Sequence, residues 1–107
     1  VAIKEGLEQI VDITKNKNPN TKIILVSPSA LTEEVLKGAF SFQFDSVSVY
    51  KSHLLSDIYS EVADEKNCRF VDLNEFASVS KEDGLHYTPS EHSKIALKLY
   101  NFINSLM

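Results

Sequence analysis

Apolar residues recur along this chain with two different periods, and these periods predict alternating helices and strands. From about Ala2 to Lys15 the apolar residues fall at helical spacing, namely Ile3, Leu7, Ile10 and Val11. Lys22 to Ser27 is instead a near-continuous apolar run that ends at Pro28, which is typical of a buried parallel strand. Helical spacing returns from about Ser48 to Glu65, and Arg69 to Leu73 predicts a short second strand.

The last segment of the chain carries the clearest signals for the start of a helix. Thr88 suits the N-cap, Pro89 suits the first helical position, and Glu91 completes a capping box. An apolar stripe follows, made of Ile95, Leu99, Phe102, Ile103 and Leu106. Residues 28–47 lack a clear period, which predicts a long functional loop or an irregular helix. The alternation of three helices with two strands favours parallel strands joined by right-handed crossovers.

These elements predict one α/β domain over residues 1–107 whose sheet is incomplete. A sheet of two strands is rarely stable by itself, and the strand at residues 22–27 would expose an apolar edge. We therefore expect further strands, supplied by a missing segment or by a second chain, and a homo-oligomer is one form of the latter. The helical pattern is already running at Val1 with no capping residue before it, which predicts that the chain begins within a longer protein.

Composition narrows the classes of protein to which the chain could belong. The 107 residues are 43% hydrophobic, and 11 basic and 15 acidic residues give a formal charge of −4 without a basic stripe. Nucleic acid is therefore not an expected partner. Cys68 is the single cysteine and cannot form an internal disulfide, and no apolar run approaches the ~20 residues that span a bilayer. These features leave the compartment open and favour the cytoplasm.

The segment Asp83-Gly84-Leu85-His86 is the candidate catalytic motif. A carboxylate three residues before a histidine can accept the imidazole N–H if Gly84 lets the backbone curl, which fixes the tautomer and leaves the other ring nitrogen to act as a base. The motif lies between the second predicted strand and the last helix, where an open α/β sheet gathers its functional groups. Asp-Gly is also a common turn former, and His86 alone would be an ordinary loop residue.

Other residues that could carry chemistry have simpler explanations. His53 and His92 fall on predicted helices and are expected to be exposed or packing residues. No further ligand joins Asp83, His86 and His92 in a convincing metal set, so neither a metal nor a cofactor is expected. Cys68 precedes a strand with no base beside it in the sequence, which predicts a small buried apolar group.

The nucleophile that a histidine base would serve is not evident. Ser27, Ser29 and Ser41 lie outside any Gly-x-Ser-x-Gly or Gly-Asp-Ser context, and strand-end or loop hydroxyls are the expected roles. Residues Phe40, Phe42 and Phe44 alternate like a half-buried extended segment. Core packing is the expected role of these rings, and a wall of an acyl pocket is the alternative.

Together these segments resemble the C-terminal half of the SGNH hydrolases, also called the GDSL esterase/lipase family. Asp83-Gly84-Leu85-His86 looks like the family's last block, whose first and fourth positions are the triad acid and base. Residues 18–28 resemble the family's fourth strand and residues 70–73 its fifth. Residues 76–78 through 86–88 are most similar to the arylesterase-like branch, which includes esterases with acyltransferase side activity. The resemblance covers essentially the whole chain and omits the half that carries the Gly-Asp-Ser-Leu block.

The resemblance implies the C-terminal part of a three-layer α/β/α, flavodoxin-like parallel sheet. It also implies a serine hydrolase of small acyl or aryl esters, in which His86 takes a proton from a serine and Asp83 orients the imidazole. The serine and the oxyanion-hole glycine and asparagine would lie on a missing N-terminal segment or a second chain, so the isolated chain is expected to be inactive. The alternative is a non-catalytic remnant of the same fold that has lost its nucleophile and acts in binding or assembly.

Overall fold

The structure, a computed structural model, describes residues 2–37 and 41–106. Its helices and strands, in chain order, are α1 (Ala2–Lys17), β1 (Ile24–Ser27), α2 (Ser46–Ser52), α3 (Leu55–Lys66), β2 (Arg69–Asp72) and α4 (Pro89–Leu106). Three short 3-10 turns complete the described elements: η1 (Glu33–Leu36), η2 (Ser41–Gln43) and η3 (Leu73–Glu75). None of these helices is both long and apolar enough to cross a membrane.

The two predicted strands form a parallel pair. β1 and β2 are aligned so that Ile24 lies opposite Arg69 and Ser27 lies opposite Asp72. Each strand is shorter than its apolar run, because the ladder begins at Ile24 rather than Lys22 and Leu73 already belongs to η3. The chain is therefore a mixed α/β fold with a parallel sheet, as the sequence predicts.

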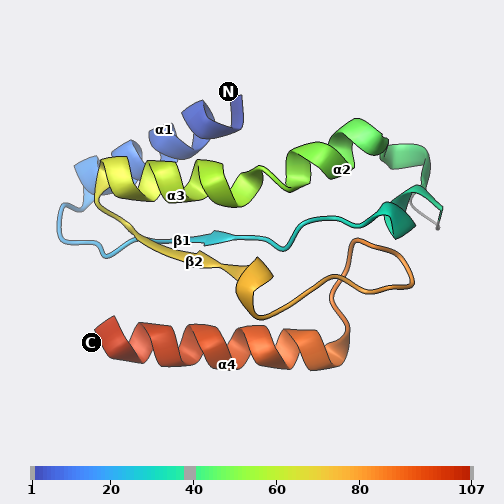
Figure 1. The fold of residues 1–107 in the computed structure, drawn as a ribbon. Coiled ribbons are helices and arrows are strands. Elements are labelled where there is room, and N and C mark those ends of the chain that lie inside the picture. Colours follow the sequence, from blue (N-terminus) through green and yellow to red (C-terminus); the bar gives the residue numbers. More distant parts are fainter. Residues whose placement is uncertain (1, 38–40, 107) are drawn as a thin grey trace. The chain divides into compact units, whose positions relative to one another are not determined.

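The chain divides into two compact units, and the first consists of residues 1–28 and 54–72. Figure 1 shows α1 and α3 side by side on one side of the two strands. The core of this unit contains Val11 of α1, Leu25 of β1 and the pair Val62 and Ala63 of α3, all nearly inaccessible to solvent. Cys68 is half-buried and packs against this core, so the expected apolar role is confirmed, although the residue is less buried than predicted.

The single helix predicted over residues 48–65 is wrong, because the chain breaks at His53 and Leu54 between α2 and α3. The side chain of Ser52 donates to the carbonyl oxygen of Val49 at 2.6 Å. Its Oγ also accepts the backbone N–H of Leu31, at 2.9 Å, which ties the end of α2 to another segment. The N–H of His53 bonds back to Tyr50, as in a tightened last turn. Helical periodicity continues through the break, so the sequence pattern does not reveal it.

The second unit consists of residues 29–53 and 73–107 and contains η1, α2 and α4. Residues 28–47 hold two 3-10 turns, in keeping with the predicted irregular segment. Phe42 lies in η2 and is 81% exposed, so the expected half-buried extended segment is wrong at this position. Phe44 is half-buried, and Phe40 lies outside the described residues.

Helix α4 begins where the sequence predicts, but its capping box is only half formed. The backbone N–H of Glu91 points to Thr88 Oγ1 at 3.4 Å, which is the expected N-cap contact. The Glu91 carboxylate does not return to the N-cap; it accepts the N–H and the hydroxyl of Ser78 and pairs with Lys94 at 2.8 Å. Glu91 therefore fixes the preceding loop to α4. In the predicted apolar stripe four residues are half-buried, whereas Ile103 is exposed.

Candidate functional site

The loop from Leu73 to Thr88 carries both candidate catalytic residues and is held by its own backbone. Buried Ala77 and Val79 fix its first half. Its second half closes on itself, because Ser80 donates its N–H to the carbonyl of His86 at 2.6 Å and accepts the N–H of Gly84 at 2.8 Å. The turn inside this closed loop is completed by Gly84, whose φ of +67° lies in the left-handed region.

Asp83 and His86 are brought together as the sequence predicts. The Oδ2 atom of Asp83 lies 2.8 Å from Nδ1 of His86. The other carboxylate oxygen accepts the backbone N–H groups of Leu85 and His86, at 2.9 and 3.0 Å. All three contacts favour the ionised carboxylate, and an aspartate that accepts two backbone N–H groups holds its side chain in one orientation. The imidazole is therefore held at Nδ1, with Nε2 as the nitrogen that could exchange a proton with a substrate group.

The electrostatics of the pair agree with this arrangement. The backbone N–H groups of Leu85 and His86 and the imidazole of His86 lower the pKa of Asp83 from 3.8 to about 2. The Asp83 side chain is 25% exposed, whereas the His86 side chain is 60% exposed. The acid is thus the sheltered partner and stays ionised at neutral pH, and the imidazole is the partner that a second molecule or segment could reach.

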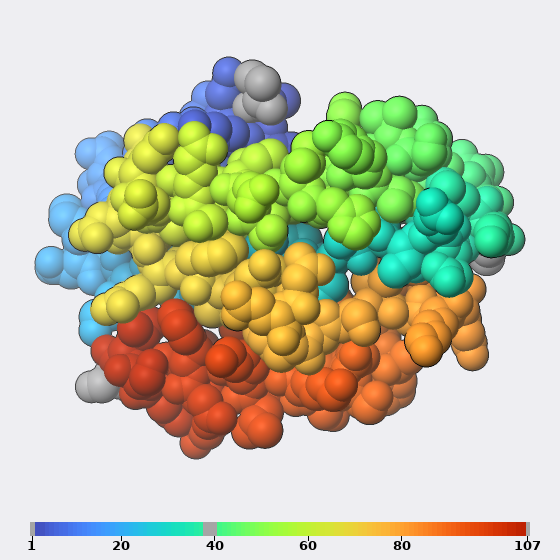
Figure 2. Space-filling view, viewed as in Figure 1, coloured from blue at the N-terminus to red at the C-terminus, as the bar shows by residue number. Residues whose placement is uncertain are grey.

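A second loop, residues 29–35, supports the loop that carries the pair. Ser29 donates its backbone N–H to the hydroxyl oxygen of Tyr87 at 2.9 Å, and Thr32 donates its N–H to the carbonyl of Gly84 at 3.2 Å. Figure 2 shows the region of η1 (teal) against the segment around residue 84 (orange). The loop at residues 29–35 therefore holds the segment of the pair at two points: at Gly84, which lies between Asp83 and His86, and at Tyr87, which follows His86.

Several polar residues that place the loop at 29–35 were not predicted from the sequence. Ala30 donates its N–H to the side-chain oxygen of Asn74 at 2.8 Å, and the Ser29 hydroxyl donates to the carbonyl of Ala77 at 2.8 Å. Such bonds join segments more than 40 positions apart, so no local spacing reveals them. Asn74 lies in η3, two positions after β2 ends at Asp72, and an amide just past a predicted strand is the local signal that the sequence offers.

Removal of the Tyr87 hydroxyl tests this support. In Tyr87→Phe the backbone N–H of Ser29, a residue only 6% exposed, loses its acceptor. We expect a loss of about 1–3 kcal/mol in the free energy of unfolding, measured by urea denaturation. Tyr100→Phe is the matched control, because Tyr100 is 65% exposed, and a change within about 0.5 kcal/mol is expected there. Equal stability of the two variants would contradict the role given to the Tyr87 hydroxyl.

The lowered pKa of Asp83 predicts a dependence of stability on pH. Because its folded-state pKa of about 2 lies below the ordinary 3.8, the carboxylate stabilises the folded state above pH 3.8, and this contribution disappears as the pH falls toward 2. We expect the carboxyl carbon of Asp83 to titrate near pH 2 by NMR. Unfolding free energies of wild type and Asp83→Asn should converge between about pH 4 and pH 2. A titration midpoint at 3.8 or above would contradict the hydrogen bonds described for Asp83.

None of the three serines considered as nucleophiles has the surroundings of one. Ser27 is fully buried at the end of β1, and its hydroxyl contacts the carbonyl of Pro28 at 3.5 Å. Ser29 is buried and bonded to Ala77, as described above. Ser41 is exposed in η2. These positions agree with the expected structural and loop roles.

His92 lies on a helix as the sequence predicts, whereas His53 lies in the break after α2 rather than within a helix; both are exposed, as expected. His53 is exposed at the end of α2. His92 is exposed on α4, and its ring meets the edge of Tyr87 with the centroids 5.6 Å apart. Across residues 2–37 and 41–106, no three histidine, cysteine or acidic side chains gather to hold a metal ion.

The surface of the second unit has two open hollows near the loop that carries the pair. A hollow of about 310 Å³ is lined by residues 74–78, Glu91 and Lys94. Another, of about 340 Å³, is lined by residues 78–81, Thr88, Ser90, Glu91 and Lys94. Neither lining includes Asp83 or His86, so these hollows do not form an acyl pocket around the pair.

Comparisons with known proteins support the fold. No family model matches the chain, and no curated protein matches it. A solved crystal structure is similar over 99% of this chain, with a TM-score of 0.87 and 22% sequence identity. The match covers 50% of that protein, so this chain spans about half of its length. At this level of identity the likeness shows the fold alone.

Proposed function

We propose that the chain supplies the catalytic acid and base of a serine ester hydrolase that acts on small acyl or aryl esters. The observation that carries this proposal is the 2.8 Å contact between Asp83 Oδ2 and His86 Nδ1. The other Asp83 oxygen is held by two backbone N–H groups, and the imidazole is exposed. The resemblance of residues 83–86 to the last block of the SGNH hydrolases assigns the two residues these roles.

In this function the nucleophile is a serine outside residues 1–107, on a preceding segment of the same polypeptide. As its hydroxyl oxygen attacks the ester carbonyl, the proton passes to Nε2 of His86. Asp83 accepts the Nδ1–H and stabilises the imidazolium without taking its proton. His86 then gives the proton to the leaving alcohol, an acyl-enzyme remains, and water attacks it through the same base to release the acid. The donors that stabilise the tetrahedral oxyanion would also come from the preceding segment.

The proposal extends to the architecture of the complete protein. The parallel pair β1 and β2 would form one end of a larger parallel sheet with helices on both faces, in a three-layer α/β/α arrangement. In such sheets, ligands bind at the carboxyl ends of the strands, and the loop that follows β2 holds Asp83 and His86. The place of the pair in the chain order, after β2 and before α4, is therefore the one that the proposed role requires.

Labelling with a fluorophosphonate, which modifies activated serines, tests the proposed function. The polypeptide encoded by the complete reading frame is treated with the reagent, and its intact mass is measured. We expect one label per polypeptide, no label in His86→Ala, and full labelling in the matched control His92→Ala, which removes the other exposed histidine near the loop. A folded wild-type polypeptide that takes no label would contradict the esterase and leave the non-catalytic module as the function.

A further inference from the structure

Helix α1 has two apolar faces, and only one of them is used within the first unit. Leu7 and Val11 pack into the core with Leu25 and Val62. Ile3, Ile10 and Ile13 lie on another side of the helix and are 51, 63 and 60% exposed. Spacings of seven and three residues place these three isoleucines along one stripe. Exposed isoleucines grouped on one side of a helix favour an interaction surface.

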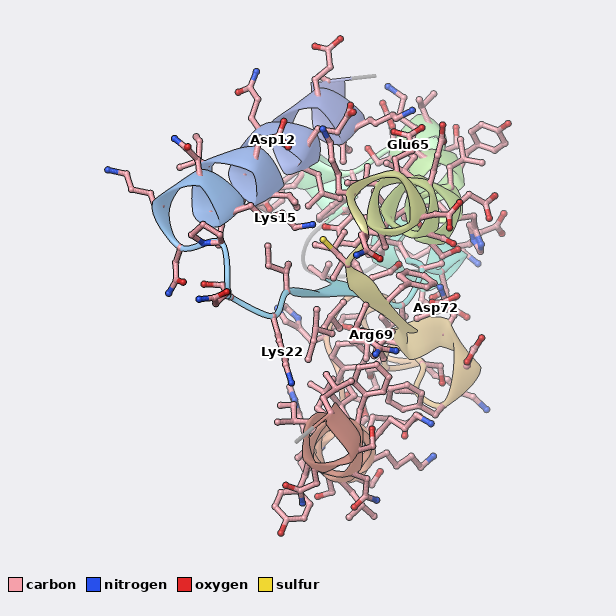
Figure 3. The ribbon with its side chains drawn as sticks, turned by 90° about the vertical axis from the view of Figure 1, so that its left-hand side faces the viewer. Asp12, Lys15, Lys22, Glu65, Arg69 and Asp72 are labelled. Carbon is pink, nitrogen blue, oxygen red and sulfur yellow. The ribbon has the colours of Figure 1, made fainter. Side chains whose placement is uncertain are left out.

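The orientation of α1 that exposes this stripe follows from its core packing, and ion pairs with α3 accompany it. Lys4 pairs with Glu61 at 2.6 Å, and Lys66 pairs with Asp12 at 3.0 Å. Figure 3 shows Lys15 directed between the two helices, where it donates to a backbone carbonyl of α3. The polar contacts therefore join α1 to α3. The three isoleucines lie on a side of α1 that these contacts do not involve.

Strand β1 has an edge that the described sheet does not use. The N–H of Arg69 bonds to the carbonyl of Ile23, so in the parallel register Ile23 and Leu25 direct their backbone groups toward β2. Because backbone groups alternate along a strand, the N–H and C=O of Ile24 and Val26 point to the opposite edge. Figure 3, which looks along the strands, shows this edge of β1 on the same side as α1.

We propose that the stripe of Ile3, Ile10 and Ile13 and the backbone edge at Ile24 and Val26 form one docking surface for a preceding α/β segment of the same polypeptide. A strand of that segment would pair in parallel with β1 and extend the sheet, and its apolar side chains would cover the isoleucines. The proposal rests on the packing of the first unit and stands whether or not the docked segment carries a nucleophile.

Two observations favour this occupant over a second copy of the chain. The similar crystal structure is one polypeptide about twice as long, and this chain matches half of it. A second copy related by a twofold axis would bring β1 against β1 in antiparallel orientation. The apolar run at residues 22–27 is instead typical of a strand inside a parallel sheet.

Hydrogen exchange of single amides tests the docking surface without any measurement of activity. The polypeptide from the complete reading frame is studied by NMR, and the exchange of Val26 N–H is compared with that of Leu25 N–H, which points to β2. We expect Val26 to exchange at least ~100-fold more slowly than an unprotected amide and within about tenfold of Leu25. Exchange of Val26 at the unprotected rate would overturn the proposal. Protection that is lost on dilution together with a dimeric mass would overturn it in favour of a second copy.

A matched pair of variants tests the isoleucine stripe in the same polypeptide. Ile10→Glu places a charge in the proposed contact, and we expect it to accelerate Val26 exchange by at least about tenfold. Val47→Glu is the control, because Val47 is 53% exposed on α2, outside this surface, and exchange of Val26 should not change. If Ile10→Glu does not fold, Ile10→Ala gives the same test through loss of apolar area alone. Equal exchange in the Ile10 and Val47 variants would overturn the part of the proposal that concerns α1.

Because exchange and labelling are separate readouts, the two proposals can fail independently. A protected Val26 amide in a polypeptide that takes no fluorophosphonate would support the docking surface and contradict the esterase. A labelled polypeptide with an unprotected Val26 amide would support the esterase and contradict the docking surface.

Discussion

Replacement of His86 by alanine in the polypeptide from the complete reading frame is expected, under the proposed esterase function, to reduce ester turnover by about 10⁴-fold or more. The reason is that no other group in the loop from Leu73 to Thr88 is an imidazole, so the proton of the serine would lose its acceptor. Because the His86 side chain is 60% exposed, its removal should leave the folded structure and the urea midpoint nearly unchanged. Turnover is followed with a short-chain aryl ester, and His92→Ala is the matched control.

Asp83→Asn should give a smaller but still large loss under the same proposal, about 10³- to 10⁴-fold. The amide keeps the shape of the side chain but removes the negative charge that holds the Nδ1–H and stabilises the imidazolium. Glu82→Gln is the control, since Glu82 is an exposed acid next to Asp83. Near-normal turnover in either His86→Ala or Asp83→Asn would show that the pair is only a turn, which is the simpler explanation of an Asp-Gly sequence.

The pair could be predicted from the sequence because it is local. His86 follows Asp83 by three positions, and Gly84 between them supplies the left-handed backbone that such a curl requires. The start of α4 was predicted for the same reason, since Thr88 and Pro89 act within one helical turn. The two strands were predicted because their apolar runs are bounded by Pro28 and by polar loops. Local sequence signals were therefore sufficient to predict the two candidate residues and the positions of most helices and strands.

The features that the sequence did not reveal depend on contacts between distant segments. The break between α2 and α3 involves the contact of Ser52 with Leu31, 21 positions away, while the helical period continues through it. The Glu91 carboxylate binds Ser78 rather than its own N-cap, although the spacing fits a capping box. The hydrogen bond that anchors the loop from Leu73 to Thr88, between Tyr87 and Ser29, joins positions 58 residues apart. Hydrophobic periodicity and helix-capping residues are local signals, so they carry no information about contacts between residues that are far apart in the sequence.

Gly84→Ala is expected to be the most destabilising single substitution proposed for the chain of residues 1–107. The residue is buried and has a φ of +67°, a conformation that costs an alanine about 1–2 kcal/mol. A Cβ atom there would lie 2.5 Å from the backbone nitrogen of Val35 and 2.7 Å from Thr32 Oγ1. Backbone cannot move aside as a flexible side chain would, so overpacking adds about 1–3 kcal/mol. Urea denaturation should therefore show a loss of about 2–5 kcal/mol.

Gly6→Ala is the matched control, and the opposite sign is expected for it. Apart from the adjacent residues and the backbone of α1 itself, no atom lies within 4 Å of a Cβ at Gly6, which is in the interior of α1, so alanine should stabilise the same chain by about 0.5–1 kcal/mol. The effect of Gly84→Ala should also reach the candidate site, because Gly84 lies between Asp83 and His86 and accepts the N–H of Thr32. Displacement of Gly84 from the loop at 29–35 would separate the carboxylate from Nδ1, so the pKa of Asp83 should rise toward 3.8 in any folded fraction. Equal unfolding midpoints for the two glycine variants would show that the close approach at Gly84 does not constrain the loop.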